Sequence, residues 1–174
     1  MSEPNRIQQL DEKTIGHISA GEVVERPAQV VKELLENSLD AGSTSIHVII
    51  ERGGFDKIQI EDNGTGIHQD DLVLSLDRHA TSKMKSPEDL NEIYTLGFRG
   101  EALASIGMVS KLTVASRPDG QEGRSIQMED GNKAEIEPFG MAKGTVVTVE
   151  HLFENTPVRL GFQCRPATEH ARIV

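Results

Sequence analysis

Glu33 and Asn37 are the first side chains in the sequence whose types and spacing suit a chemical role. They are four residues apart in an apolar-periodic segment, so a helix would place them on one face, about a turn from each other. An amide oxygen is a hard ligand for Mg²⁺, and a carboxylate can orient or deprotonate a water. The pair therefore suits Mg²⁺-dependent phosphoryl chemistry. The alternative is a solvated polar face, which amphipathic helices commonly carry.

A second candidate is Asp62, in the segment EDNGTG at residues 61–66, directly after a predicted strand. Glycines such as Gly66 let the backbone approach a flat ligand closely. A carboxylate at this point can accept a hydrogen bond from an exocyclic amine. Adenine offers that donor and guanine has an acceptor in its place, so Asp62 would select adenine. The alternative is a plain turn, for which Asp-Asn-Gly is a common sequence.

A third candidate segment runs from Gly97 to Leu103, with His79 to Lys83 upstream. Two glycines before a helix start can present backbone N–H groups and a positive helix end to an anion, and Arg99 and Lys83 add cationic donors. No Gly-x-x-x-x-Gly-Lys-Ser/Thr motif occurs, so a phosphate site here would not be a P-loop. The alternative is a flexible surface loop.

Histidine and cysteine give no comparable signal. The six histidines show no metal-ligand spacing. Cys164 would be a nucleophile only beside a base that the sequence does not place, so a buried or incidental thiol is the simpler interpretation. A single cysteine excludes an internal disulfide framework and fits a reducing cytoplasm.

Helices and strands predicted from apolar periodicity would position these residues. Helical spacing predicts a helix from Pro27 to Ala41, followed by Gly42 as a C-terminal cap. Shorter helices are predicted at residues 11–20, 70–76 and 101–109. Alternation predicts strands at residues 44–52, 57–61, 111–116, 124–129, 134–137 and 145–150. This order indicates an α+β fold, a two-layer sandwich with helices on one face of a mainly antiparallel mixed sheet.

Composition limits the function classes. The chain has 174 residues, with 18 basic and 28 acidic side chains, so its formal charge is −10. This length suits one domain, and the acidic balance argues against a dedicated DNA-coating protein. No apolar run approaches the ~18 residues of a membrane span, and the N-terminus lacks a signal peptide's apolar stretch.

The order of the motifs resembles a known ATP-binding domain, the GHKL or Bergerat fold. DNA gyrase B subunits, the large heat-shock chaperones, sensor histidine kinases and MutL share it. The shared order is an acid and Asn on a helix, Asp-x-Gly-x-Gly, a glycine-bearing lid and Gly144-Thr145 opening a strand. Four runs narrow the resemblance to the MutL/PMS mismatch-repair family: ISAGEVVERP at 18–27, ELLENSLDAG at 33–42, HATSK at 79–83 and GFRGEAL at 97–103. The match extends from about residue 7 to Arg159.

The resemblance implies a role for each matching residue. Glu33 would be the general base that activates water, and Glu36 would help to shape the acidic end of the site. Asn37 would bind Mg²⁺ alongside the phosphate oxygens. Asp62 would contact the adenine amine, with Gly66 giving the base room and Thr145 supporting the same hydrogen-bond network.

The resemblance also implies a lid over the nucleotide, at residues 79–103. Thr81, Ser82 and Lys83 would belong to this lid. The remaining nucleotide-binding residues would surround the phosphates at a helix N-terminus: Gly97, Phe98, Arg99, Gly100, Glu101, Ala102 and Leu103.

The family pattern sets the expected domain boundaries. Residues 1–155 would form the ATP-binding domain, with 1–20 as an N-terminal arm, and 156–174 a truncated or divergent tail where a second domain would begin. After Pro157 the family typically continues with Ala-Arg and a basic stretch, whereas this chain continues VRLGFQ. In the family the second domain supplies a lysine that reaches the γ-phosphate and much of the DNA-binding surface. A distant C-terminal domain supplies dimerisation. No position here matches these features.

The resemblance thus predicts Mg²⁺-dependent ATP binding and slow hydrolysis, with a nucleotide-gated lid and partner recruitment. The expected partners are a MutS-like protein, DNA and a second MutL-like chain in an ATP-dependent homo- or heterodimer, with no membrane. The expected compartment is the cytoplasm in a prokaryote or the nucleus in a eukaryote. One alternative is a module that binds ATP or ADP with negligible hydrolysis. Another is a sensor-kinase catalytic domain, against which the 97–103 segment argues and which phosphotransfer to a response regulator would test.

Overall fold

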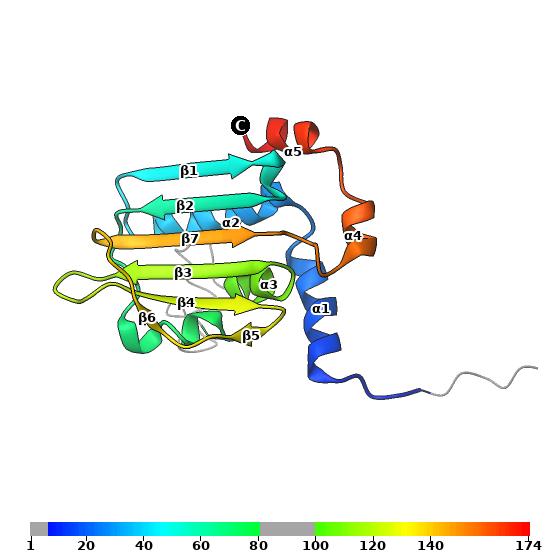
Figure 1. The fold of residues 1–174 in the computed structure, drawn as a ribbon, viewed down its shortest axis with the longest axis horizontal. Helices are drawn as coiled ribbons and strands as arrows, with labels where there is room; N and C mark the ends of the chain where they lie inside the picture. The colour runs from blue at the N-terminus through cyan, green and yellow to red at the C-terminus, as the bar shows by residue number, and fades with distance from the viewer. Residues whose placement is uncertain (1–6, 81–99) are drawn as a thin grey trace, which may run out of the picture.

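A seven-stranded sheet organises the chain, and a computed structural model describes residues 7–80 and 100–174 of it (Figure 1). The sheet order is β1-β2-β7-β3-β4-β5, with β6 beside β4. Every strand pairing in the described part is antiparallel. The strands are β1 (Ile46–Glu51), β2 (Lys57–Asp62), β3 (Lys111–Arg117), β4 (Arg124–Glu129), β5 (Asn132–Lys133), β6 (Glu137–Pro138) and β7 (Gly144–Glu150).

Alternation along the central strands separates the two faces of the sheet. On β2 the side chains of Ile58 and Ile60 are buried, and their partners on β7 are Val149 and Val147. Val147 pairs in turn with Val114 of β3, which is also buried. Since directly opposed residues in an antiparallel pair share a face, these side chains form continuous apolar rows. The core lies against this face.

In the described part of the chain, helices α1 (Glu12–Val23), α2 (Pro27–Asp40) and α3 (Ala102–Met108) lie on this core face of the sheet (Figure 1). The helix α2 begins with proline at its first turn, where the missing N–H costs no intrahelical bond. It buries Val30, Val31 and Leu34 against the sheet. The shorter helices α1 and α3 pack against each other beside it.

Two helices near the C-terminus fold back onto this domain. They are α4 (Pro157–Gly161) and α5 (Pro166–Ile173), and each has a proline in its first turn. The helix α5 packs against α2 and against the 3₁₀ turn η1 (Arg52–Gly54). Gly53 has φ +67° there, and a Cβ on it would lie 2.3 Å from the Pro166 carbonyl oxygen. The close approach of α5 therefore requires glycine at this position.

The α+β class, with helices on one face of an antiparallel sheet, is confirmed, as are helix 27–41 and the hairpin of the first two strands. The helix predicted at residues 70–76 is wrong. Two 3₁₀ turns stand there instead, η2 (Gln69–Asp71) and η3 (Leu74–Leu76). The segment is short, and an isolated α-helical turn is costly to nucleate, whereas 3₁₀ turns still bury Leu72 and Leu76.

The strand predicted at residues 134–137 is also wrong. Residues 134–136 form no strand: the two-residue β5 ends before them and the two-residue β6 begins at Glu137, and both pair with β4. Pro138 has no backbone N–H, so it cannot extend a ladder on both sides. The predicted lid residues Thr81, Ser82, Lys83, Gly97, Phe98 and Arg99 lie outside the described part of the chain.

Candidate functional site

The face of α2 brings the predicted acidic residues to the edge of the core. Glu33, Glu36 and Asn37 are half-buried, while Leu34 and Ser38 on the adjoining face of the helix are buried. The Lys32 ammonium lies 3.7 Å from the Glu36 carboxylate, one turn along the helix. Glu33 and Asn37 thus border the core rather than lying on the fully solvated side of α2.

The Asp62 carboxylate is held at the end of β2 by two hydrogen bonds. Its Oδ2 accepts from the Ser38 hydroxyl at 2.8 Å, and its Oδ1 accepts from the Gly64 backbone N–H at 2.9 Å. The side chain is buried, with 8% of its surface exposed. The bond to Ser38 ties β2 to α2, so Asp62 lies beside the helix that carries Asn37.

Thr145, the second residue of β7, lies directly opposite Asp62. Ser116 of β3 lies opposite Thr145 on its other side. The two hydroxyl oxygens are 3.0 Å apart, and both side chains are buried. Three adjacent strands therefore place Asp62, Thr145 and Ser116 in one polar row on the core face, immediately beyond the apolar row of Ile60, Val147 and Val114.

Two residues of this row's network were not predicted. Ser38 follows Leu34 by one helical turn on the buried face of α2, and Ser116 follows Leu112 and Val114 on the inward face of β3. For both residues, the only local sequence signal is a serine that ends a series of periodically spaced apolar residues. Their connection to Asp62 and Thr145 depends on the sheet order, which joins strands far apart in the sequence.

Glycines fix the loop after β2 against the protein's own backbone. Gly66 has φ +76°, and a Cβ on it would lie 2.9 Å from the Pro118 nitrogen and 3.0 Å from the Arg117 carbonyl. Chain packing therefore demands glycine here, in addition to any room that it leaves for a base. Asn63 secures the same loop, because its Oδ1 accepts from the backbone N–H groups of Thr44 and Ser45.

The described end of the predicted phosphate segment leads into α3. Gly100 has φ +60°, Glu101 precedes the helix, and Ala102 and Leu103 form its first turn. The Glu101 carboxylate lies 3.0 Å from His79 Nδ1. The helices α3 and α2 cover the same face of the sheet (Figure 1). Contact of this segment with a phosphate stays a prediction.

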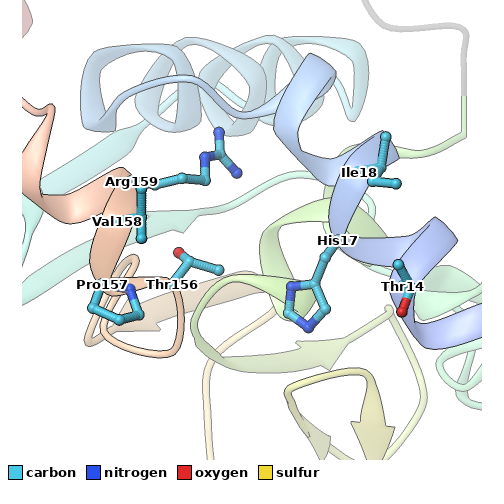
Figure 2. Close-up of a pocket in the computed structure, with 7 residues that line it drawn as sticks. All are labelled: Thr14, His17, Ile18, Thr156, Pro157, Val158 and Arg159. Carbon is cyan, nitrogen blue, oxygen red and sulfur yellow. The ribbon is translucent and has the colours of Figure 1, made fainter. Parts of the chain in front are cut away.

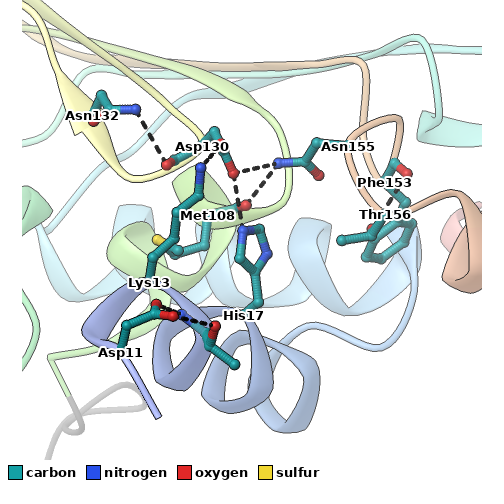
Figure 3. Close-up of polar contacts among 10 residues, drawn as sticks. Asp11, Lys13, His17, Met108, Asp130, Asn132, Phe153, Asn155 and Thr156 are labelled. Carbon is teal, nitrogen blue, oxygen red and sulfur yellow. Dashed lines mark hydrogen bonds and ion pairs between the residues drawn. The ribbon is translucent and has the colours of Figure 1, made fainter.

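A polar cluster anchors α1 to the turn after β4 (Figure 3). The Asp130 carboxylate pairs with the Lys13 ammonium and with His17 Nε2, the latter at 2.9 Å. Asn155 Nδ2 donates to the Met108 carbonyl at 2.9 Å and to Asp130 Oδ1 at 3.3 Å. The hydrogen bond from Lys13 is the main cause that lowers the pKa of Asp130, and its charge and His17 add to it.

A cavity of about 370 Å³ lies between α1 and the start of α4 (Figure 2). It is lined by Thr14, His17, Ile18, Thr156, Pro157, Val158 and Arg159. The Arg159 guanidinium donates to the Gly21 and Val24 carbonyls at the end of α1. Burial lowers the pKa of Arg159. This cavity does not include Asp62 or Thr145 and is separate from the candidate site.

Within residues 7–80 and 100–174, no three His, Cys, Asp or Glu side chains converge as a metal-binding group. A Mg²⁺ site with one protein amide and several phosphate oxygens needs no such cluster, so Asn37 fits that chemistry. No helix in the described residues is both long and apolar enough to cross a membrane.

Comparison with known proteins gives the class. The profile of the histidine kinase-, DNA gyrase B- and HSP90-like ATPases matches residues 25–138. This segment contains α2, the Asp62 loop and α3. The chain belongs to this ATPase family.

Within the family, its similar relatives are DNA mismatch repair proteins named MutL. Those from Pelobacter propionicus and a Thermoanaerobacter species are 53% and 52% identical over 97% and 98% of this chain. The chain spans 28% of the length of each. The MutL ATPase domain of Aquifex aeolicus complexed with ADP is 38% identical, with a TM-score of 0.65 over 87% of this chain and 52% of that one. The resemblance to the MutL/PMS family is confirmed.

Proposed function

We propose that this chain binds ATP with Mg²⁺ and hydrolyses it slowly, as the ATPase domain of a MutL-like mismatch-repair protein. The observation that carries the proposal is the position of Asp62. Its carboxylate is buried at the end of β2, held by Ser38 and Gly64, and set beside Thr145. A fixed acceptor of this kind suits an exocyclic amine. The helix that holds it also presents Glu33 and Asn37.

Each residue then has a defined task. Asp62 accepts from the adenine amine, and Thr145 borders the same edge of the base. Mg²⁺, when bound, would neutralise charge on the phosphates, and Asn37 would supply one of its oxygen ligands. Glu33 would hold the attacking water and take its proton, with Glu36 keeping that end of the site acidic. The segment from Gly100 to Leu103 would face the phosphates with its backbone N–H groups.

The lid and the partners extend this proposal beyond the described site. Thr81, Ser82, Lys83, Gly97, Phe98 and Arg99 would close over the bound nucleotide. ATP would then favour the conformation that recruits a MutS-like protein, DNA and a second MutL-like chain. The support is that the relatives are mismatch repair proteins. The compartment would be that of the DNA, the cytoplasm in a prokaryote.

Calorimetric titration tests the binding step. The protein is titrated with ATP, ADP and a non-hydrolysable ATP analogue, each with and without Mg²⁺. We expect all three nucleotides to bind, and we expect Mg²⁺ to raise the affinity for ATP and for its analogue. No heat and no thermal stabilisation with any of them would contradict the proposal.

A second candidate function is a nucleotide-binding module with negligible hydrolysis. The chain spans only 28% of its MutL relatives, and the family resemblance places a lysine for the γ-phosphate in a further domain. A steady-state phosphate-release assay separates the two functions. Release above background that Glu33→Ala removes favours the ATPase, whereas binding without such release favours the module.

A further inference from the structure

The hydroxyl of Ser116 joins three parts of the candidate base site. Its Oγ lies 2.8 Å from the backbone nitrogen of Ile67, 3.0 Å from the Gly144 carbonyl oxygen and 3.0 Å from Thr145 Oγ1. The residue is 2% exposed. It therefore connects the loop after β2 to the start of β7, in the same row as Thr145 and Asp62.

Only one assignment of donors and acceptors makes all three of these contacts hydrogen bonds. A serine hydroxyl has one hydrogen and two lone pairs. The Ile67 N–H can only donate, so it donates to one lone pair of Ser116 Oγ. The Gly144 carbonyl can only accept, so it accepts the Ser116 hydroxyl hydrogen. The other lone pair then accepts from the Thr145 hydroxyl. Buried polar groups are normally satisfied, which favours this arrangement over one that leaves the Gly144 contact without a hydrogen.

This arrangement gives Thr145 the same polarity as Asp62. The hydrogen of Thr145 is directed to Ser116, so Thr145 presents only lone pairs to the rest of the site. The Asp62 oxygens also present lone pairs, because one accepts from Ser38 and the other from Gly64. The two side chains that would flank the base in the proposed site are therefore both hydrogen-bond acceptors.

We propose that Ser116 is a specificity-determining residue, because it holds the Thr145 hydrogen and makes the base end of the site accept hydrogen bonds only. The inference rests on the proposed nucleotide site. A purine edge with an exocyclic amine offers hydrogens to this end. A 6-oxo purine differs at two positions, because its oxygen replaces the amine and its N1 carries a hydrogen. At the exocyclic position the oxygen places lone pairs against lone pairs, and Thr145 cannot turn its hydrogen toward that oxygen without breaking its bond to Ser116.

Titration of ATP and inosine triphosphate against Ser116 variants tests the proposal. The unsubstituted protein should bind ATP more tightly than inosine triphosphate, which carries an oxygen in place of the amine. Ser116→Ala frees the Thr145 hydroxyl to donate to that oxygen. The ratio of the ATP affinity to the inosine triphosphate affinity should therefore fall about fivefold to tenfold, the worth of one hydrogen bond.

Two variants provide controls. Ser116→Thr keeps the hydroxyl and should keep the ratio. Ser125→Ala removes a serine hydroxyl from the neighbouring strand, opposite Ala115 and on the other face of the sheet, and should change neither affinity.

The outcomes separate this inference from the proposed function. If the unsubstituted protein binds no ATP, the nucleotide site itself is contradicted. If it binds ATP, the inference is overturned by equal affinities for the two nucleotides in the unsubstituted protein. It is also overturned by Ser116→Ala weakening both to the same extent, which a purely structural role predicts. If Ser116→Ala does not fold, Ser116→Cys replaces it in the test. A thiol is only a weak hydrogen-bond acceptor, so this variant must also lower the ratio of the ATP affinity to the inosine triphosphate affinity.

Discussion

In the proposed site, base recognition depends on Asp62. Asp62→Asn should weaken ATP binding by about 1–3 kcal/mol, because the amide either presents a donor to the adenine amine or rotates to offer a weaker acceptor. Either orientation also turns the NH₂ group toward one of the two donors that hold the carboxylate, the Ser38 hydroxyl or the Gly64 N–H. Calorimetry measures the change, and GTP should bind poorly to the unsubstituted protein. Equal affinities for ATP and GTP would show that Asp62 does not select the base.

Glu33 and Asn37 should separate into a hydrolytic and a metal-binding role. Asn37→Ala should remove most of the Mg²⁺ dependence of ATP affinity, because a hard oxygen ligand is lost. Glu33→Ala should leave ATP affinity nearly unchanged and abolish hydrolysis, because a base acts on the water rather than on the ground-state nucleotide. Titration with and without Mg²⁺ and a phosphate-release assay measure the two effects.

Lys32→Arg provides a matched control on the exposed side of the same helix, because it keeps the cation that pairs with Glu36. It should change neither the Mg²⁺ dependence nor the rate. Loss of binding in Glu33→Ala, with unchanged turnover per bound nucleotide, would reverse the assigned role.

How far the sequence predicts the site depends on whether the signal is local. Glu33 and Asn37 are one helical turn apart, and Asp62 lies in a glycine-rich turn, so each is visible in a few residues of sequence. In the sequence, Ser116 is 49 residues from Ile67, whose N–H donates to its hydroxyl, and 29 residues from Thr145. Its role arises only when β7 inserts between β2 and β3, and no local pattern encodes that order.

At the scale of elements, the predicted structure holds where a long apolar periodicity exists, as in α2 and the central strands. It fails where short segments take their conformation from packing. The region at residues 69–76 forms 3₁₀ turns, and α4 and α5 are only 5 and 8 residues long. The available signal for these two helices is a proline at each N-terminus, which marks where a helix can begin but not that it does.

The attachment of α1 to the turn after β4 should depend on pH through Asp130. Its lowered pKa means that the ionised form is stabilised in the folded protein, chiefly by Lys13. This contribution is complete at pH values above the carboxyl's unfolded pKa, about 4, and is lost as pH falls through the lowered folded value. Asp130→Asn should therefore lower the thermal midpoint at neutral pH and have a progressively smaller effect in more acidic solution. If Asp130→Asn lowers the thermal midpoint by the same amount at neutral and at acidic pH, the carboxylate charge is not what anchors α1.

The face of the sheet opposite the core carries a row of alternating charge across five strands. Glu51, Lys57, Glu150, Lys111 and Glu129 are successive cross-strand partners. Lys57→Glu would place three acidic side chains next to one another on β1, β2 and β7. Because like charges directly opposed are destabilising, it should lower the free energy of unfolding by about 1 kcal/mol. Urea unfolding measures the change at low salt.

Lys57→Gln is the control for this row, since it removes the attraction without adding repulsion and should cost less. Salt screens exposed charges, so the difference between the two variants should shrink at high ionic strength. Equal stability of the two variants at low salt would show that the row contributes no measurable electrostatic energy.

At the scale of the whole molecule, the 174-residue chain contains the base and metal parts of the proposed site but covers 28% of its MutL relatives. Phosphoryl transfer is catalysed mainly by positioning and by charges directed at the transferring group. The family resemblance places one such charge, a lysine for the γ-phosphate, in a further domain. Loss of one donor of this kind commonly costs ~10²–10³ in rate. A lid with fewer surfaces to dock on should also close less often.

The chain assayed by itself should therefore bind ATP, hydrolyse it very slowly and form no ATP-dependent dimer at micromolar concentration. Sedimentation with the non-hydrolysable analogue measures the dimer, and phosphate release measures the turnover. A relative that carries both domains is the reference for each. If the 174-residue chain dimerises with nucleotide and matches the turnover of that relative, then α2, the Asp62 loop and the segment before α3 supply all the groups that the reaction needs. The role assigned to the further lysine would then be excluded for this protein.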